Sequence, residues 1–171
     1  MSARASDLAT QLEQINQQVI DLVSGDADLS VTCPSEGWTA AAVGAHIGGA
    51  HRGILEGLIQ PIVAGREVPS TVGPSNEGNA RQAAENAALP REQILRLLRD
   101  HGAMATAYLR SLSDEDLDRT ATIPIFGENP VTAETVIERV LIGHASDHAN
   151  SLRQGLGQTA GHTHDWQEAP A

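Results

Sequence analysis

The sequence predicts an all-α protein, a four-helix bundle with one short extra helix. Aromatic residues make up only 2% of the 171 residues, although 40% of the chain is hydrophobic. The core must therefore consist mostly of Leu, Ile, Val and Ala, which suits packed helices better than a sheet. Four long segments carry apolar residues at helical spacing. The strict alternation of a half-buried strand is almost absent, and these three observations together indicate the class.

The first two long helices are expected over residues 5–24 and 39–65. In both segments apolar residues recur every three or four positions, which places them on one face of a helix. Thr39 suits the N-cap of the second helix, because its hydroxyl can accept a hydrogen bond from a free backbone N–H. Pro61 should kink or end the last turn of this helix, since proline has no backbone donor.

Two further long helices are expected over residues 90–112 and 132–154. Thr132 can cap the later one, and Gly155 lies just past its end, where glycine often stops a helix. The segment NARQAAENAAL, residues 79–89, predicts the short extra helix.

The segments between these helices are mostly polar. Residues 65–78 form a long polar connection, and residues 119–131 are expected to be a loop or a short extended piece. The motif SDEDL, residues 113–117, has the spacing of a capping box and predicts one helical turn. We therefore expect one domain over residues 1–156 and a C-terminal tail over residues 157–171.

The charge of the chain excludes some classes of function. The formal net charge is −11, whereas a nucleic-acid-binding protein needs a basic surface. The same charge disfavours an anionic membrane surface, so we expect neither partner. All eleven basic residues are arginine, which excludes Schiff-base and P-loop lysine chemistry. The single Cys33 excludes an internal disulfide, and the absence of an apolar N-terminal run predicts a cytoplasmic protein.

Two histidines stand where leucines would be expected in the last long helix. In VLIGHASDHANSLRQ, residues 140–154, His144 and His148 continue the apolar stripe of Ile137 and Leu141. Side chains four residues apart lie one above the other and can reach a single ion. Burying an imidazole without partners costs about 1–3 kcal/mol. A divalent metal would satisfy both residues, and two core histidines hydrogen-bonded to neighbours are the alternative.

A third candidate ligand lies in the second helix. His46 falls on its core-facing stripe, and His51 lies roughly 140° away around the helix and is expected at the surface or rim. Three neutral imidazoles from two facing helices would make a metal site with open positions, which is typical of catalytic rather than structural metal.

Each of the remaining candidate site residues has a functional interpretation and an ordinary structural one. His101 points inward and could be a fourth ligand, could orient a ligand or a substrate, or could be a core histidine with its own partner. Asp147 and Asn150 could orient the ligands or a substrate, or lie on a solvated face. Arg153 could bind an anionic substrate or form a surface ion pair. Two tail histidines could fold over the metal or remain in solvent: His162 and His164.

Several motifs resemble the DinB-like superfamily. In GWTAAAVGAHIGGAHR, a tryptophan before the helix, Trp38, is followed eight residues later by His46. HASDHANSLRQ resembles the closing motif of the family, with a histidine pair on the last long helix. The middle segments SNEGNARQAAENAALPREQILRLLRDH and SLSDEDLDRTA also resemble the family. The likeness spans about residues 5–156, and the order and spacing of the motifs carry it.

The resemblance implies a four-helix bundle of unusual connectivity, often a homodimer, with a divalent metal on His46, His144 and His148. Imidazole ligands suit Zn, Ni, Cu and Fe alike. Zn or Ni is the expected metal, with Fe, Cu and Mn as alternatives. The superfamily includes mycothiol-dependent maleylpyruvate isomerases and bacillithiol-type transferases, in which the metal binds a thiolate. In the mycothiol branch the first ligand of the last helix is commonly glutamate. Here it is histidine, which points to the broader DinB-like group.

Three functions follow as hypotheses. The first is a metal-dependent enzyme that uses a low-molecular-weight thiol in an S-transfer or isomerisation, because a metal deprotonates a coordinated thiol. The second is a hydrolase that uses metal-bound water. It needs a carboxylate base, and Asp147 is the only obvious candidate although it lies about 100° from His148 on the helix. The third is a metal-stabilised stress-response or binding module without catalysis.

Overall fold

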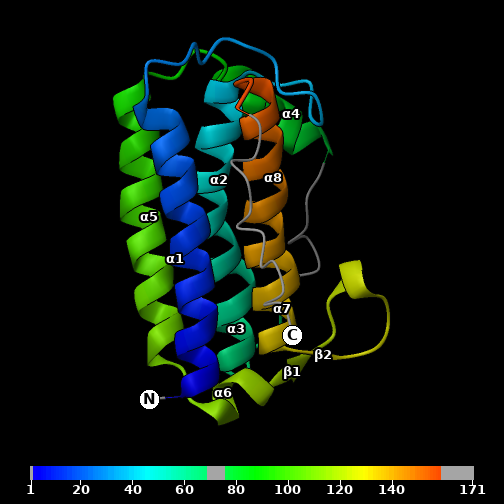
Figure 1. Cartoon of the computed structure of the whole chain (residues 1–171). Coiled ribbons are helices and arrows are strands. Elements are labelled where there is room, and N and C mark those ends of the chain that lie inside the picture. The colour runs from blue at the N-terminus through cyan, green and yellow to red at the C-terminus, as the bar shows by residue number, and fades with distance from the viewer. Residues whose placement is uncertain (1, 69–75, 159–171) are drawn as a thin grey trace, which may run out of the picture.

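The chain folds into a four-helix bundle, as the sequence predicts, and the computed structural model describes residues 2–68 and 76–158 (Figure 1). Two of the long helices are regular, and each of the other two contains a π-helical segment. They are α1 (Ala3–Ser24), the continuous run of α2 (Ala40–Ile54), η1 (Leu55–Ile59) and α3 (Gln60–Val63), α5 (Arg91–Ser111), and the continuous run of α7 (Ala133–Val136), η3 (Ile137–Ile142) and α8 (Gly143–Gly155).

Shorter elements connect the long helices. The extra helix α4 (Asn76–Glu85) lies three to four residues earlier than expected, and α6 (Asp114–Asp118) is the predicted turn. The strands β1 (Thr120–Ala121) and β2 (Val131–Thr132) pair antiparallel. Between them the chain leaves the bundle as an arm, residues 122–130, which contains the 3₁₀ turn η2 (Pro124–Phe126) (Figure 1).

Hydroxyl side chains cap the helices where the sequence places them. Thr39 accepts a hydrogen bond from the N–H of Ala42, and Thr132 accepts one from Thr135. Ser113 and Asp116 form the predicted capping box. The end of α8 differs from the expectation, because Gly155 is still helical and the left-handed φ of +65° occurs at Gly157.

Pro61 does not end its helix, which continues to Val63. Instead, the π-helical η1 ends two residues before Pro61, and the N–H of Gln60 bonds to the carbonyl of Leu55, five residues back. Proline lacks an N–H and its ring clashes with the preceding turn of a regular helix. A wider turn accommodates this defect, so a π segment replaces the predicted kink.

A second π segment lies in the last long helix. The N–H of Gly143 bonds to the carbonyl of Glu138, five residues back, at the point where η3 passes into α8. A π turn adds one residue to the helix and rotates everything after it relative to a regular helix. His144 is the second residue of α8, so η3 sets the direction of the histidines of α8 relative to the part of the helix before it.

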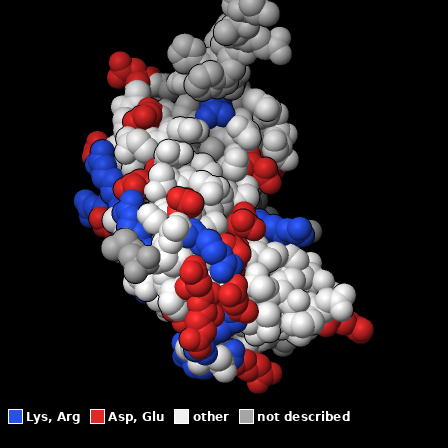
Figure 2. Space-filling model, turned by 60° about the horizontal axis from the view of Figure 1, so that its bottom comes forward, with Lys and Arg blue, Asp and Glu red and all other residues white. Residues whose placement is uncertain are grey.

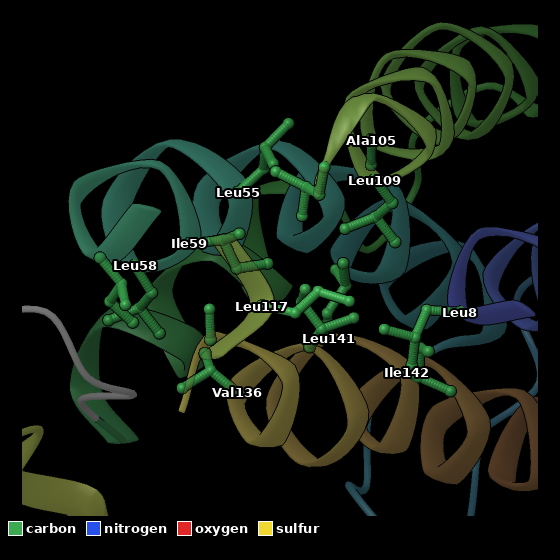
Figure 3. Close-up of a cluster of buried hydrophobic side chains, with 14 of the residues drawn as sticks. Leu8, Leu55, Leu58, Ile59, Ala105, Leu109, Leu117, Val136, Leu141 and Ile142 are labelled. Atoms are coloured by element: carbon green, nitrogen blue, oxygen red, sulfur yellow. The ribbon is translucent and has the colours of Figure 1, made fainter. Parts of the chain in front are cut away.

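The core consists of two hydrophobic clusters. The lower cluster joins the first half of α1, η1, the end of α5 and η3, and several of its side chains are labelled in Figure 3. The upper cluster joins the second half of α1 to α2, α5 and α8. Leu109, Leu117 and Leu141 are fully buried in the lower cluster, as are Ile47 and Leu98 in the upper one. These clusters hold α2 and α8 against each other.

Charged side chains of both signs are interspersed on the face shown in Figure 2. Arg4 at the start of α1 forms ion pairs with Asp118 at 2.8 Å and Glu134 at 2.6 Å. These contacts connect α1 to α6 and α7 across the end of the bundle. Among the described residues, the helices are too short or too polar for any of them to cross a membrane.

Candidate metal centre

Three histidines converge between α2 and α8. His46 comes from α2, and His144 and His148 come from successive turns of α8. One ring nitrogen from each lies within 4.8 Å of the others, and the Nε2 atoms of His46 and His144 are 2.9 Å apart. The sequence predicts these three residues as one cluster, and the structure brings them together.

Glu36 fixes the orientation of His148. Its Oε1 lies 2.6 Å from His148 Nδ1, and its Oε2 accepts a hydrogen bond of 2.5 Å from the hydroxyl of Ser151. Because a carboxylate accepts, Nδ1 of His148 carries the hydrogen, and Nε2 keeps its lone pair for a ligand. A carboxylate behind a histidine is the arrangement that commonly orients metal ligands and makes them more basic.

Gln82 and Trp38 contact the other side of the cluster. The Oε1 of Gln82, from α4, lies 3.3 Å from His46 Nδ1, so His46 also directs its Nε2 inward. The ring of Trp38 stacks on His148, with centroids 6.4 Å apart, and meets His46 edge-on at 5.3 Å. Rings packed in this way restrict the rotation of both imidazoles.

Burial favours the neutral form of two of the histidines. It lowers the pKa of His46 below its ordinary value, despite the hydrogen bond to Gln82. Burial, with smaller effects from the neighbouring His148 and His46, lowers the pKa of His144 to about 3. Both imidazoles are therefore neutral at neutral pH, which is the form that binds a metal ion.

These residues fit a divalent metal. The cluster supplies three imidazole nitrogens, and hydrogen bonds to Glu36 and Gln82 direct two of them toward its centre. Within the described residues, no further His, Cys, Asp or Glu joins the group. Three protein ligands leave coordination positions open, which distinguishes catalytic from structural zinc sites.

The open side of the cluster faces a cavity of about 620 Å³. His46 and His144 line one part of it, together with Gln82 and Asn79 of α4 and Asp147 of α8. This volume is in the range of pockets that bind small molecules. The arrangement therefore places two of the three potential metal ligands, His46 and His144, at the wall of a space large enough for an organic substrate, with His148 beside them.

The other predicted site residues lie in different places. Asp147 lines the cavity, whereas Asn150 accepts a hydrogen bond of 2.8 Å from Arg153, which also contacts Gln18 of α1. His101 Nδ1 donates to the carbonyl of Gly48 at 2.9 Å. His101, Asn150 and Arg153 thus have other partners and do not line the cavity. His162 and His164 lie outside the described residues.

The expectation for His51 is wrong. It is only 1% exposed, and its Nε2 donates to the Oδ1 of Asn16 at 3.0 Å. Asn16 in turn donates to the carbonyl of Leu98 at 3.0 Å. Because α2 contacts α5, α8 and α4, a side chain 140° away from His46 still faces a neighbouring helix.

Three residues around the site were not predicted: Glu36, Gln82 and Arg139. Glu36 lies in a loop, where no periodicity indicates the direction of a side chain. Gln82 lies on a short helix whose contacts depend on the fold. Arg139 lines the cavity from η3, where the π turn changes the register. Only the proximity of Glu36 to Trp38 in the sequence could have drawn attention to it.

Comparison with known proteins gives consistent results. The profile of the DinB superfamily matches residues 8–152. YfiT from Bacillus subtilis, described as a probable metal-dependent hydrolase with an unusual four-helix bundle topology, has 19% identity and a TM-score of 0.67, over 93% of this chain and 91% of YfiT. A mycothiol-dependent maleylpyruvate isomerase has 18% identity and a TM-score of 0.66, over 89% of this chain.

The match to the isomerase is partial, because this chain spans only 63% of that protein. A histidine-to-alanine mutant of a mycothiol-dependent maleylpyruvate isomerase gives a TM-score of 0.69 with 17% identity, over 94% of this chain and 65% of the other. At these identities the likeness to solved structures concerns the fold. No curated protein matches the chain.

Proposed function

The chain belongs to the DinB superfamily, and on this basis we propose that it is a divalent-metal-dependent enzyme acting on a small organic molecule. The observation that carries the proposal is the convergence of His46, His144 and His148 in one cluster, two members of which, His46 and His144, line the 620 Å³ cavity. A purely structural metal would need neither the open side nor the cavity. This favours an enzyme over a metal-stabilised module without catalysis.

The three histidines would hold the metal through ring nitrogens, a ligand set that suits Zn, Ni, Cu and Fe. Glu36 and Gln82 would keep two of the rings in position. Trp38 packs beside the cluster and would exclude water from one side of it. A bound divalent ion would supply Lewis acidity, which lowers the pKa of a coordinated water molecule or thiol.

The position of Asp147 favours hydrolysis. It follows His144 by three residues, lines the same cavity and is not part of the ligand cluster. A carboxylate beside a catalytic metal that is not a ligand can accept a proton from the attacking nucleophile. Its angle on the helix is unfavourable from the sequence alone, but the cavity extends far enough around α8 to include it. We therefore place hydrolysis first.

A thiol-dependent transfer or isomerisation is the second candidate. It is supported by the fold shared with the mycothiol-dependent isomerase. The nucleophile would have to be an external low-molecular-weight thiol. Cys33 is fully buried, and this burial raises the pKa of its thiol to about 11, so it does not form a reactive thiolate.

Metal analysis of the protein purified without a histidine tag tests the proposal. After incubation with Zn or Ni and removal of free metal, we expect about one ion per chain, lost in His46→Ala and in His144→Ala. His101→Ala is the matched control, because His101 bonds to a backbone carbonyl outside the cluster, and should keep the ion. Metal-free wild-type protein, or equal metal content in all variants, would refute the proposal.

Activity assays distinguish the two chemistries. If hydrolysis is correct, the metal-loaded protein should cleave a panel of activated esters and amides, and Asp147→Asn should lose most of this activity while keeping its metal. Asp100→Asn, an exposed position on α5, is the control. Metal-dependent binding of mycothiol or bacillithiol in calorimetry, without hydrolysis, would favour the thiol route instead.

A further inference from the structure

The cavity beside the three histidines has two chemically different ends. One end holds the polar groups of His46, His144 and Asp147. The other end is apolar and is lined by Ile54 and Leu58 of α2 and η1, Val140 of η3, and Ile125 and Phe126 of the arm. Leu58 lies 12 residues after His46, so about 18 Å of helix separates the two. The cavity thus continues along the bundle well beyond the metal cluster.

The arm supplies part of the apolar wall. Ile125 is 48% exposed, and it is the one large hydrophobic residue exposed to this degree within the described chain. Phe126 beside it is half-buried. The arm leaves the bundle at β1 and returns at β2, close to the end of the helix that carries Leu58 (Figure 1). An apolar ligand in the cavity would cover Ile125, which otherwise faces water at the edge of the cavity.

Arg139 adds a cation to this apolar end. It lines the cavity from η3, directly before Val140. Its guanidinium has no hydrogen bond or ion pair to any residue of the described chain, in contrast to Arg4, Arg52 and Arg110. Asp147 lies eight residues further along the helix, or about 12 Å away along its axis. The positive and negative groups of the cavity are therefore at different ends.

We propose that the cavity binds an amphipathic organic anion, with its carboxylate on Arg139 and its apolar body against Ile54, Leu58, Ile125, Phe126 and Val140. The inference rests on the proposed function for the reaction itself, since the reactive end of the ligand would lie at the histidines. An arginine without a partner pairs well with a carboxylate, because its planar fork can donate two parallel hydrogen bonds.

The surroundings of the site support a specific role for this arginine. The chain has a formal net charge of −11, so its overall field repels anions. An anion therefore needs a local cation to bind, and apart from the proposed metal ion at the polar end, Arg139 is the only cationic side chain among the described residues that line the cavity. The apolar lining selects against small hydrophilic anions, because these would leave it exposed to water.

Calorimetry with octanoate and with the neutral octanamide tests the inference. Both probes have the same chain length, and only octanoate carries a charge. We expect wild-type protein to bind octanoate more tightly than octanamide. Arg139→Gln should weaken the binding of octanoate about tenfold and leave the affinity for octanamide unchanged. Arg99→Gln, an exposed arginine of α5 outside the cavity, is the matched control and should bind both as wild type does.

A second variant tests the apolar wall. Ile125→Asn removes an exposed apolar side chain and should not affect folding, yet it should weaken octanoate and octanamide to a similar degree. Equal affinity for octanoate and octanamide in wild-type protein would overturn the inference. Unchanged octanoate binding in Arg139→Gln would overturn it as well.

The same titrations on chelator-treated protein and on His144→Ala separate this inference from the proposed function. Octanoate binding that disappears with the metal, and that does not depend on Arg139, would place the carboxylate at the histidines and overturn the inference while the metal site stands. Arg139-dependent binding in a protein that takes up no metal would support the inference although the proposed function had failed.

Discussion

Glu36 and His148 are joined by a hydrogen bond of 2.6 Å, although they are 112 residues apart in the sequence. Both side chains are largely buried, with exposures of 10% for Glu36 and 17% for His148. Charge-assisted hydrogen bonds between such groups are among the stronger ones in proteins. The loop before α2 is thereby attached to α8 at the histidine cluster, and Glu36 positions His148 without being a member of that cluster.

Glu36→Gln should weaken metal binding about tenfold, and Glu36→Ala more strongly, within the 10- to 100-fold range typical of such outer residues. Glutamine can still accept the hydrogen bond but lacks the negative charge that makes the imidazole more basic. A competition titration with a chromophoric zinc chelator measures the affinity. Glu92→Gln, at an exposed position of α5, should bind metal like wild type. Unchanged affinity in Glu36→Ala would show that Glu36 does not support the site.

Metal binding should stabilise the fold. A ligand that binds only the folded state at one hundred times its Kd adds about 2.7 kcal/mol. For a chain of this size, this corresponds to a rise in Tm of about 5–10 °C. Thermal unfolding followed by circular dichroism, with and without added zinc, measures the shift. His148→Ala should show little or no rise, and a rise equal to that of wild type would mean that the ion binds elsewhere.

Stability should decrease at acidic pH because of His51. Its burial, with a smaller effect from His101, lowers the pKa of His51 to about 4. The unfolded chain takes up a proton on this histidine near pH 6.5, whereas the folded chain does not. The stability of the folded state is therefore unaffected by the titration of His51 above pH 6.5, and it decreases as the pH falls from 6.5 toward 4. Between pH 7 and pH 5 the free energy of unfolding should decrease by about 2 kcal/mol because of His51.

Urea denaturation of metal-free protein at a series of pH values measures this effect. His46 and His144 are also buried, so the slope of wild type alone does not identify the residue. His51→Gln keeps a donor for Asn16 but cannot titrate, and its free energy of unfolding should depend less on pH than that of wild type. The same slope in both proteins would assign the effect to other groups.

The three histidines could be predicted because they lie on helices. On a helix, sequence spacing gives the direction of each side chain, and His144 and His148 lie four residues apart within the regular helix α8. The same reasoning misplaced His51, because it assumed that a helix has one buried face. In this bundle α2 is covered on several sides, so a polar residue outside the main stripe can still be buried with its own partner, Asn16.

Other features depend on the fold rather than on local pattern. The contact of Glu36 is made across the molecule from a loop, and spacing carries no information about such a contact. The sequence does show that Pro61 lacks the N–H of a regular helix. Proline alone does not decide whether the helix kinks or widens, and here the π segment before Pro61 accommodates it. The π segment of η3 contains no proline, and its stripe of apolar residues looks regular. The position of Arg139 in the cavity therefore required the structure.

The helices α2 and α5 approach each other closely at Gly48. A Cβ added there would lie 2.9 Å from the Cβ of Leu97 and 3.1 Å from both the carbonyl carbon of Leu97 and the backbone nitrogen of Leu98. Two of these atoms are backbone, so they cannot rotate away as a side chain could. The carbonyl of Gly48 also accepts the hydrogen bond from His101, which ties the two helices together at the same point.

Gly48→Ala should therefore destabilise the protein by about 1–3 kcal/mol, because the two helices must separate to admit the methyl group. This is opposite in sign to the usual effect, since alanine in a helix is ordinarily better than glycine by up to about 1 kcal/mol. Gly53→Ala in the same helix is the matched control, because no atom lies within 4 Å of a Cβ added there, and it should be neutral or stabilising. Urea denaturation measures both. If Gly48→Ala were as stable as Gly53→Ala, the tight packing of α2 on α5 would not contribute to the stability of the bundle.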